Sequence, residues 1–148
     1  MTNLEFELYK TKRRIILKFP RFGSELARAG ITFRNDLKYK TAATDGKDIF
    51  IDPGYFTSLS NDDRVFLVAH EFMHNKFKHM LRLRDKNGEM RDLDVWNYVC
   101  DAIINANLEK EGFKIKEGYV NYPDAVNYSA EELYEIVRRM EEDGFFFE

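Results

Sequence analysis

The sequence lacks the features that cross-link a chain or anchor it in a membrane. It has a single cysteine, Cys100, which excludes an intrachain disulfide bond and a zinc knuckle built from several cysteines. No apolar run approaches the length of a membrane span, and residues 1–14 lack the hydrophobic region of a signal peptide. The net charge is only −3, which gives no electrostatic reason to expect nucleic-acid binding. We therefore expect a soluble, cytoplasmic protein that binds neither nucleic acid nor membranes.

Internal repeats, low-complexity tracts and linkers rich in Pro, Gly or Ser are also absent from the sequence. Hydrophobic residues make up 44% of the 148 positions and aromatic residues 15%, which is enough bulky material for one well-filled core. Residues 1–148 are therefore expected to form one domain. The apolar residues 145–147 are expected either to dock on the body of the protein or to mark a contact with a partner.

The hydrophobic pattern predicts an α+β fold. Ser60 is a suitable N-cap, so a buried helix is expected to begin after it and to include the apolar run 65–69. The other helices are expected at residues 3–19, 24–29, 92–109 and 129–143, and strands at 31–34, 48–52 and, as a further option, 37–39. We expect a small, mostly antiparallel sheet of about three strands, packed on the buried helix and on a second long helix.

His70, Glu71 and His74 form an H-E-x-x-H motif in the buried helix. Residues four apart lie about 40° apart around a helix, so both imidazoles can reach one metal ion. Glu71 projects beside them, where its carboxylate can polarise a water molecule and carry the proton to the leaving group. Two histidines and a glutamate buried without a partner would cost several kcal/mol. The motif therefore predicts one Zn²⁺ per chain, with His70 and His74 as ligands and Glu71 as the catalytic residue.

A zinc site with an open position needs a third protein ligand. Asp101 is the preferred candidate, because Asn97, Asp101 and Asn105 form a polar stripe at four-residue spacing on an otherwise largely apolar helix. Asn97 and Asn105 are then expected to orient the histidines or the backbone. Asp92 and Asp94 could also reach the site, although helix capping accounts for them.

His79 is the reserve candidate for the third ligand. Nine helical residues after His70 it would face about 180° away, so it could bind the metal only if the helix broke before it. Residues 75–78 contain no glycine to break the helix. Cys100 is expected to be a small buried hydrophobe, and Tyr98, Tyr119 or Tyr122 could supply a phenol that stabilises an oxyanion.

Several separated segments of the chain resemble one known family, the metallopeptidase domain of bacteria and phages that is often fused to a von Willebrand factor A-like domain. The resemblance covers residues 3–140, and the segments that carry it are residues 41–46, 51–56 and 67–74, with Trp96, Asn97, Asp101, Ile104 and Asn105. It implies a zincin-like fold in which an edge strand, with residues 48–52 as the candidate, holds an extended peptide above the active-site helix. The family pattern also has a histidine at the position of His79 and an arginine soon after it, Arg82 or Arg84 here.

The leading hypothesis is a zinc-dependent metallopeptidase that acts on a peptide or protein substrate. This chain has no room for the von Willebrand-like domain, so recruitment is expected to come from a protein partner or to be absent. The alternative is a catalytically silent zinc-binding regulatory or interaction protein of phage or bacterial origin. A zinc hydrolase that acts on a non-peptide amide is a third option. Glu71 favours an enzyme, because a structural zinc ion does not need that carboxylate.

Overall fold

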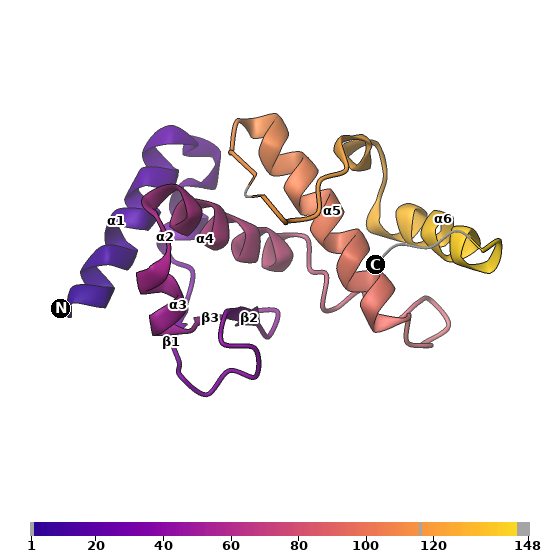
Figure 1. The fold of residues 1–148 in the computed structure, drawn as a ribbon, viewed down its shortest axis with the longest axis horizontal. Helices are drawn as coiled ribbons and strands as arrows, with labels where there is room; N and C mark the ends of the chain where they lie inside the picture. The colour runs from indigo at the N-terminus through magenta and orange to yellow at the C-terminus, as the bar shows by residue number, and fades with distance from the viewer. Residues whose placement is uncertain (1, 116, 145–148) are drawn as a thin grey trace. The chain divides into compact units, whose positions relative to one another are not determined.

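The computed structural model describes residues 2–115 and 117–144 of the chain (Figure 1). They form two compact units, Met1–Met80 and Leu81–Glu148, and each is described by itself. The apolar residues 145–147, for which docking or a partner contact is predicted, lie outside the described residues. Within the described part of the chain, no helix combines the length with the apolar character that a bilayer crossing requires.

The first unit opens with α1 (Asn3–Lys18), which confirms the helix predicted at residues 3–19. A capping box fixes its start: the Thr2 hydroxyl accepts a hydrogen bond from the Glu5 backbone N–H, and the Glu5 carboxylate accepts one from the Thr2 N–H. A short 3₁₀ turn, η1 (Pro20–Phe22), leads into α2 (Gly23–Ala27), which occupies most of the second predicted helix. The amphipathic pattern and the position of Pro20 therefore predicted α1 well.

A three-stranded sheet follows, made of β1 (Ile31–Phe33), β2 (Ala42–Thr44) and β3 (Ile49–Ile51) in the order β1-β3-β2. All three strands precede the motif helix, as predicted. The sheet is mixed, because β1 pairs with β3 in parallel and β2 pairs with β3 antiparallel. The prediction of a mostly antiparallel sheet was therefore wrong. Two of the three strands lie in the predicted segments 31–34 and 48–52.

The third strand was placed wrongly in the sequence prediction. Residues 37–39 are not a strand; Lys40 there adopts a left-handed backbone (φ 53°), and its N–H donates to the Leu37 carbonyl, so the chain turns. The strand is instead β2, whose sequence Ala-Ala-Thr has little intrinsic strand preference. Its pairing with β3 on one side is what makes it extended. Because β3 lies between two partners, the predicted edge strand 48–52 is the central strand of the sheet.

A helix that the sequence prediction missed, α3 (Pro53–Ser58), begins directly after β3. The Asp52 side chain accepts a hydrogen bond from the Tyr55 N–H (2.9 Å), and Pro53 occupies the first helical position, where its missing N–H costs nothing. Pro53-Gly54 does end the strand, as predicted. The same dipeptide also starts a helix, so Asp-Pro is a helix-start signal here.

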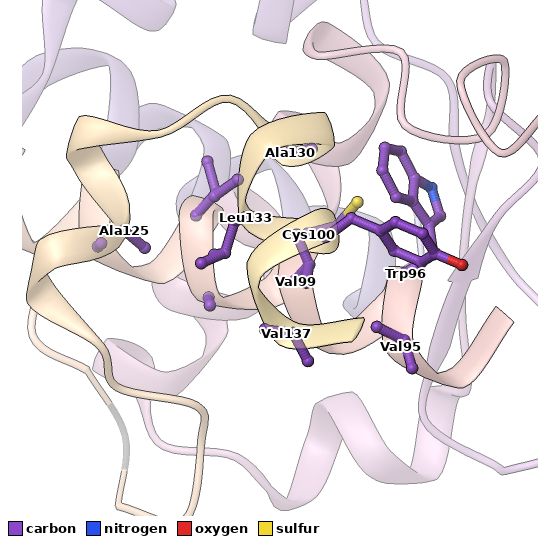
Figure 2. Close-up of a cluster of buried hydrophobic side chains, with 12 residues drawn as sticks. Val95, Trp96, Val99, Cys100, Ala125, Ala130, Leu133 and Val137 are labelled. Carbon is purple, nitrogen blue, oxygen red and sulfur yellow. The ribbon is translucent and has the colours of Figure 1, made fainter. Parts of the chain in front are cut away.

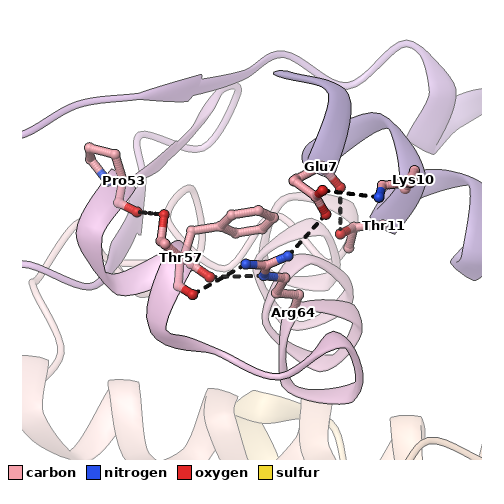
Figure 3. Close-up of polar contacts among 7 residues, drawn as sticks. Glu7, Lys10, Thr11, Pro53, Thr57 and Arg64 are labelled. Atoms are coloured by element: carbon pink, nitrogen blue, oxygen red, sulfur yellow. Dashed lines mark hydrogen bonds and ion pairs between the residues drawn. The ribbon is translucent and has the colours of Figure 1, made fainter. Parts of the chain in front are cut away.

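Arg64 joins three helices of the first unit, α1, α3 and α4 (Figure 3). Its guanidinium lies over the ring of Phe56, 4.6 Å from the centroid, and its Nε donates to the Phe56 carbonyl (2.9 Å). Other nitrogens of the same group donate to the Thr57 carbonyl (3.3 Å) and to the Glu7 carboxylate (3.2 Å). One planar cation thus holds the start of α4 against the helices that precede it.

The second unit is built on α5 (Leu93–Glu111) and α6 (Ala130–Glu142), with the 3₁₀ segment η2 (Pro123–Asn127) between them. Both helices confirm predictions, including the left-handed Gly112 (φ 107°) that caps α5 and the capping box at the start of α6. Buried side chains of the two helices face each other in one cluster (Figure 2). Within it the rings of Trp96 and Tyr134 pack edge to face, 5.9 Å apart.

Candidate metal centre

The motif lies on α4 (Asn61–Lys76), which confirms the predicted helix and its N-cap. The Ser60 hydroxyl accepts a hydrogen bond from the Asp63 N–H (3.2 Å), and two aspartates occupy the first turn, where negative charge suits the helix dipole. The helix is buried along most of its second half. Residues 66–70 are all buried, and His70 is only 7% exposed. The sequence prediction of a buried helix with polar motif residues inside it is therefore confirmed.

The two histidines of the motif face each other with the same nitrogen. His70 Nε2 and His74 Nε2 lie 3.1 Å apart, and the ring centroids are 4.7 Å apart at 78° to one another. Glu71 lies between them in sequence and is half-buried. The four-residue spacing thus brings the two imidazoles together on one side of the helix, as predicted.

This pair of nitrogens fits a bound zinc ion. Zinc binds imidazole nitrogen at about 2.0–2.1 Å, so one ion could contact two nitrogens that are 3.1 Å apart. The donor type also fits, because neutral imidazole is a common zinc ligand.

His79 lies much nearer to the motif than the sequence predicted. The helix ends at Lys76, and Lys78 adopts a left-handed backbone with φ 57°. The Lys78 N–H then donates to the Asn75 carbonyl (3.1 Å), and the His79 N–H donates to the His74 carbonyl (3.2 Å). These two hydrogen bonds are those of a Schellman motif, the common ending of α-helices. The expected continuous helix through His79 was therefore wrong.

The physical reason for that error is the residue at the left-handed position. Schellman motifs usually have glycine there, and this one has Lys78. The reversal carries the buried imidazole of His79 back to His74, so that the two Nδ1 atoms are 3.2 Å apart. The ring of His79 also packs near that of Phe77, with centroids 5.5 Å apart.

Strand β2 is attached to the residue that follows His74. The Thr44 hydroxyl donates to the Asn75 side-chain oxygen (2.5 Å), and the Asn75 amide nitrogen donates to the Lys47 carbonyl (3.3 Å). The sheet therefore contacts α4 through β2 and the turn that follows it. The sequence analysis assigned no role to Thr44 or Asn75. Neither residue belongs to a sequence motif that would have predicted the hydrogen bond between them.

The other predicted site residues lie on α5, in the second unit. Asp101 is half-buried, Asn97 is exposed and Asn105 is buried. The Asn105 amide nitrogen donates to the Val120 carbonyl (2.8 Å), which fixes the chain after the helix. Asp92 caps the helix, because its carboxylate accepts a hydrogen bond from the Val95 N–H (3.1 Å). Capping thus accounts for Asp92, as the sequence analysis expected.

Cys100 and the two arginines after His79 also have structural roles. Cys100 is 1% exposed within the hydrophobic cluster, and burial raises the pKa of its thiol well above the ordinary value, which confirms a small buried hydrophobe. Arg82 forms a two-pronged ion pair with Glu131 on α6, and this hydrogen-bonded pair lowers the pKa of Glu131. Arg84 donates to the Gly88 carbonyl (3.0 Å) within its own loop.

The elements and the motif define a mixed α/β protein whose buried helix presents paired histidines. This chain belongs to the family described as "Putative metallopeptidase domain", which it matches over residues 4–145. No curated protein and no solved structure matches the chain. The family membership confirms the resemblance drawn from the sequence, and it indicates a metal-dependent protease class.

Proposed function

We propose that this protein is a zinc-dependent metallopeptidase that hydrolyses peptide bonds in a peptide or protein substrate. The observation that carries the proposal is the 3.1 Å separation of His70 Nε2 and His74 Nε2 on a buried helix that also holds Glu71. Membership of the metallopeptidase family also supports it.

His70 and His74 would hold the ion through their Nε2 atoms, and Asp101 would complete the protein ligands, with His79 as the alternative third ligand. A carboxylate suits this position, because His₂-carboxylate sets with an open fourth position are typical of catalytic zinc. Asn97 and Asn105 would orient the ligands from the same helix as Asp101. A zinc ion held there would supply a Lewis acid that polarises the peptide carbonyl and lowers the pKa of water.

Glu71 would carry the proton through the reaction. Its carboxylate accepts a proton from the attacking water molecule as the new C–O bond forms at the peptide carbonyl. It then donates this proton to the amide nitrogen as the C–N bond breaks, which releases an amine and a carboxylic acid. A half-buried position suits both steps, because partial exclusion of water strengthens the charge interactions of the carboxylate.

The test of this proposal is Glu71→Gln, with Asp62→Asn on the exposed first turn of the same helix as the matched control. Zinc content is measured by mass spectrometry after dialysis, and turnover is measured on a fluorogenic peptide library. We expect Glu71→Gln to retain one zinc ion per chain and to lose activity by at least about 10²-fold. Unchanged turnover would remove Glu71 from the mechanism. Zinc binding without turnover in the unsubstituted protein would favour the silent zinc-binding alternative.

We further propose that the outer edge of β2 holds the substrate backbone, in place of the predicted strand 48–52, which is central in the sheet. Two hydrogen bonds fix the alternation of the ladder between β2 and β3: the Asp52 N–H donates to the Thr41 carbonyl (2.8 Å), and the Asp45 N–H donates to the Asp48 carbonyl (3.3 Å). By that alternation, Ala42 directs its N–H away from β3. An extended peptide could add to that edge through main-chain hydrogen bonds.

Ala42→Pro removes the outward N–H, and Ala42→Val is the matched control that keeps it. We expect the proline variant to raise KM about 5- to 10-fold at unchanged zinc affinity, the loss of roughly one hydrogen bond. The valine variant should keep KM within about two-fold, because Val suits a strand. Equal KM values for both variants would exclude this edge as the substrate site.

A further inference from the structure

His74 has a histidine neighbour on each side of its ring. Its Nε2 is 3.1 Å from His70 Nε2, and its Nδ1 is 3.2 Å from His79 Nδ1. The two nitrogens of an imidazole point in different directions, so His70 and His79 approach His74 from different sides. We infer that His79 is a positioning residue, which accepts a hydrogen bond from His74 and so presents His74 Nε2 to the metal. The inference rests on the proposed function, because it assigns His79 a task at the same metal centre.

The role of His79 follows from the position of the proton on the ring of His74. A neutral imidazole carries one proton, on either Nδ1 or Nε2, and only the bare nitrogen can bind a metal. If Nε2 of His74 is to face the ion, the proton must be on Nδ1 and needs an acceptor. His79 Nδ1 lies within hydrogen-bond distance of that proton. His79 in turn then carries its own proton on Nε2.

The same assignment also accounts for the contact between His70 and His74. A hydrogen bond between His70 Nε2 and His74 Nε2 needs one donor and one acceptor. With the proton of His74 on Nδ1, His70 donates to His74 Nε2 and His74 donates to His79 Nδ1. The three rings then form one directional chain. The reverse chain would place a proton on His74 Nε2, where it blocks metal binding.

The backbone fixes His79 in this position. The Schellman ending attaches the His79 N–H to the carbonyl of His74, so the two residues are joined both through the main chain and through their rings. His79 is only 3% exposed, which limits competition from water for the ring hydrogen bond. A histidine five residues after another is thus brought back to it by the helix ending alone.

The experiment compares two substitutions at position 79 in the full chain. His79→Asn keeps a side-chain oxygen near the place of Nδ1 and has no atom in the place of Nε2. His79→Phe keeps a ring to pack near Phe77 and has no nitrogen acceptor. Zinc affinity is measured by competition with a chromophoric chelator, and the tautomer of His74 is measured by long-range ¹H–¹⁵N NMR.

We expect His79→Phe to weaken zinc binding about 10- to 100-fold, as is usual when the hydrogen-bond partner of a metal-ligating histidine is lost. His79→Asn should keep zinc affinity within about three-fold of the unsubstituted protein, since it restores the acceptor. Equal losses in both variants would overturn the inference and favour His79 as a ligand through Nε2. Unchanged affinity in His79→Phe would also overturn it.

The NMR measurement separates this inference from the proposed function. It is made on the unsubstituted, metal-free protein and therefore needs neither zinc binding nor turnover. We expect the proton of His74 on Nδ1, with Nε2 bare. A proton on His74 Nε2 overturns the positioning role even if the protein is an active zinc enzyme. Failure of the unsubstituted protein to bind zinc would instead count against the proposed function. The tautomer of His74 could still be measured by NMR in that case.

Discussion

The left-handed backbone at Lys78 predicts how glycine and alanine differ in stability at this position. The sign of that difference depends on where α4 ends. At φ 57° a residue with a Cβ atom is strained by about 1–2 kcal/mol, and glycine is not. Glycine also has more conformational entropy than alanine in the unfolded chain. This lowers the stability of the folded glycine variant by about 0.4–1 kcal/mol and opposes the gain from the relieved strain. Lys78→Gly and Lys78→Ala both remove the exposed lysine side chain, so the effect of that loss cancels when the two variants are compared. We expect the glycine variant to be more stable than the alanine variant by about 0.5–1 kcal/mol.

The matched comparison is made two residues earlier. Lys76 is the last residue of α4, where glycine should be less stable than alanine by about 0.5–1 kcal/mol. The ion pair of Lys76 with Glu25 (3.3 Å) is lost in both variants and so cancels. Stability is measured by urea unfolding monitored by circular dichroism, with equal m values required for the comparison. The glycine-minus-alanine difference should therefore change sign between positions 76 and 78.

The same sign at both positions would refute this reasoning. If alanine were the more stable residue at position 78 as well, the helix would continue through Lys78, as the sequence pattern predicts. His79 would then face away from His74, and its proposed positioning role would fall with it. If the sign changes, Lys78→Gly should also keep zinc affinity within about two-fold, because it leaves the Schellman hydrogen bonds in place.

Two further predictions concern ion pairs away from the motif. Arg64→Ala should lower the free energy of unfolding by about 2–4 kcal/mol. It removes a charged hydrogen bond to the Phe56 carbonyl, worth about 1.5–3 kcal/mol, and the cation–π contact, worth about 0.5–1 kcal/mol. A loss below about 1 kcal/mol in urea unfolding would contradict this prediction. The lowered pKa of Glu131 beside Arg82 stabilises the fold above the ordinary value of 4.5, and this stability is lost as the pH falls through the folded pKa. Glu131→Gln should therefore show a flatter decline of stability below pH 4.5 than the unsubstituted protein, and parallel declines would rule this out.

Most of the helices could be predicted from the sequence because their ends carry local signals, although α3 was missed. Thr2 with Glu5 and Ser129 with Glu132 are capping boxes, and Gly112 is a left-handed C-cap. Each acts through hydrogen bonds to residues a few positions away, so the local sequence contains most of the information. The motif helix could be predicted for the same reason, with Ser60 as its cap.

The features that the sequence did not reveal depend on partners or on rare conformations. Ala42–Thr44 is a strand because β3 pairs with it, and its composition alone does not favour that. His79 returns to His74 because Lys78 adopts a conformation that most residues avoid, and no glycine marks the position. Asp101 is predicted as the third ligand from a polar stripe on its own helix, and its role as a ligand stays a proposal.

The early end of α4 also has an electrostatic consequence. The aligned peptide groups of a helix leave partial negative charge at its C-terminus, which stabilises a nearby cation by about 0.3–1 kcal/mol at an exposed site and by more where the site is partly buried. Because α4 stops at Lys76, His74 belongs to the last turn, where this effect is concentrated. A helix that ran on through His79 would move that negative end away from the motif. The Schellman ending thus favours positive charge beside the two histidines.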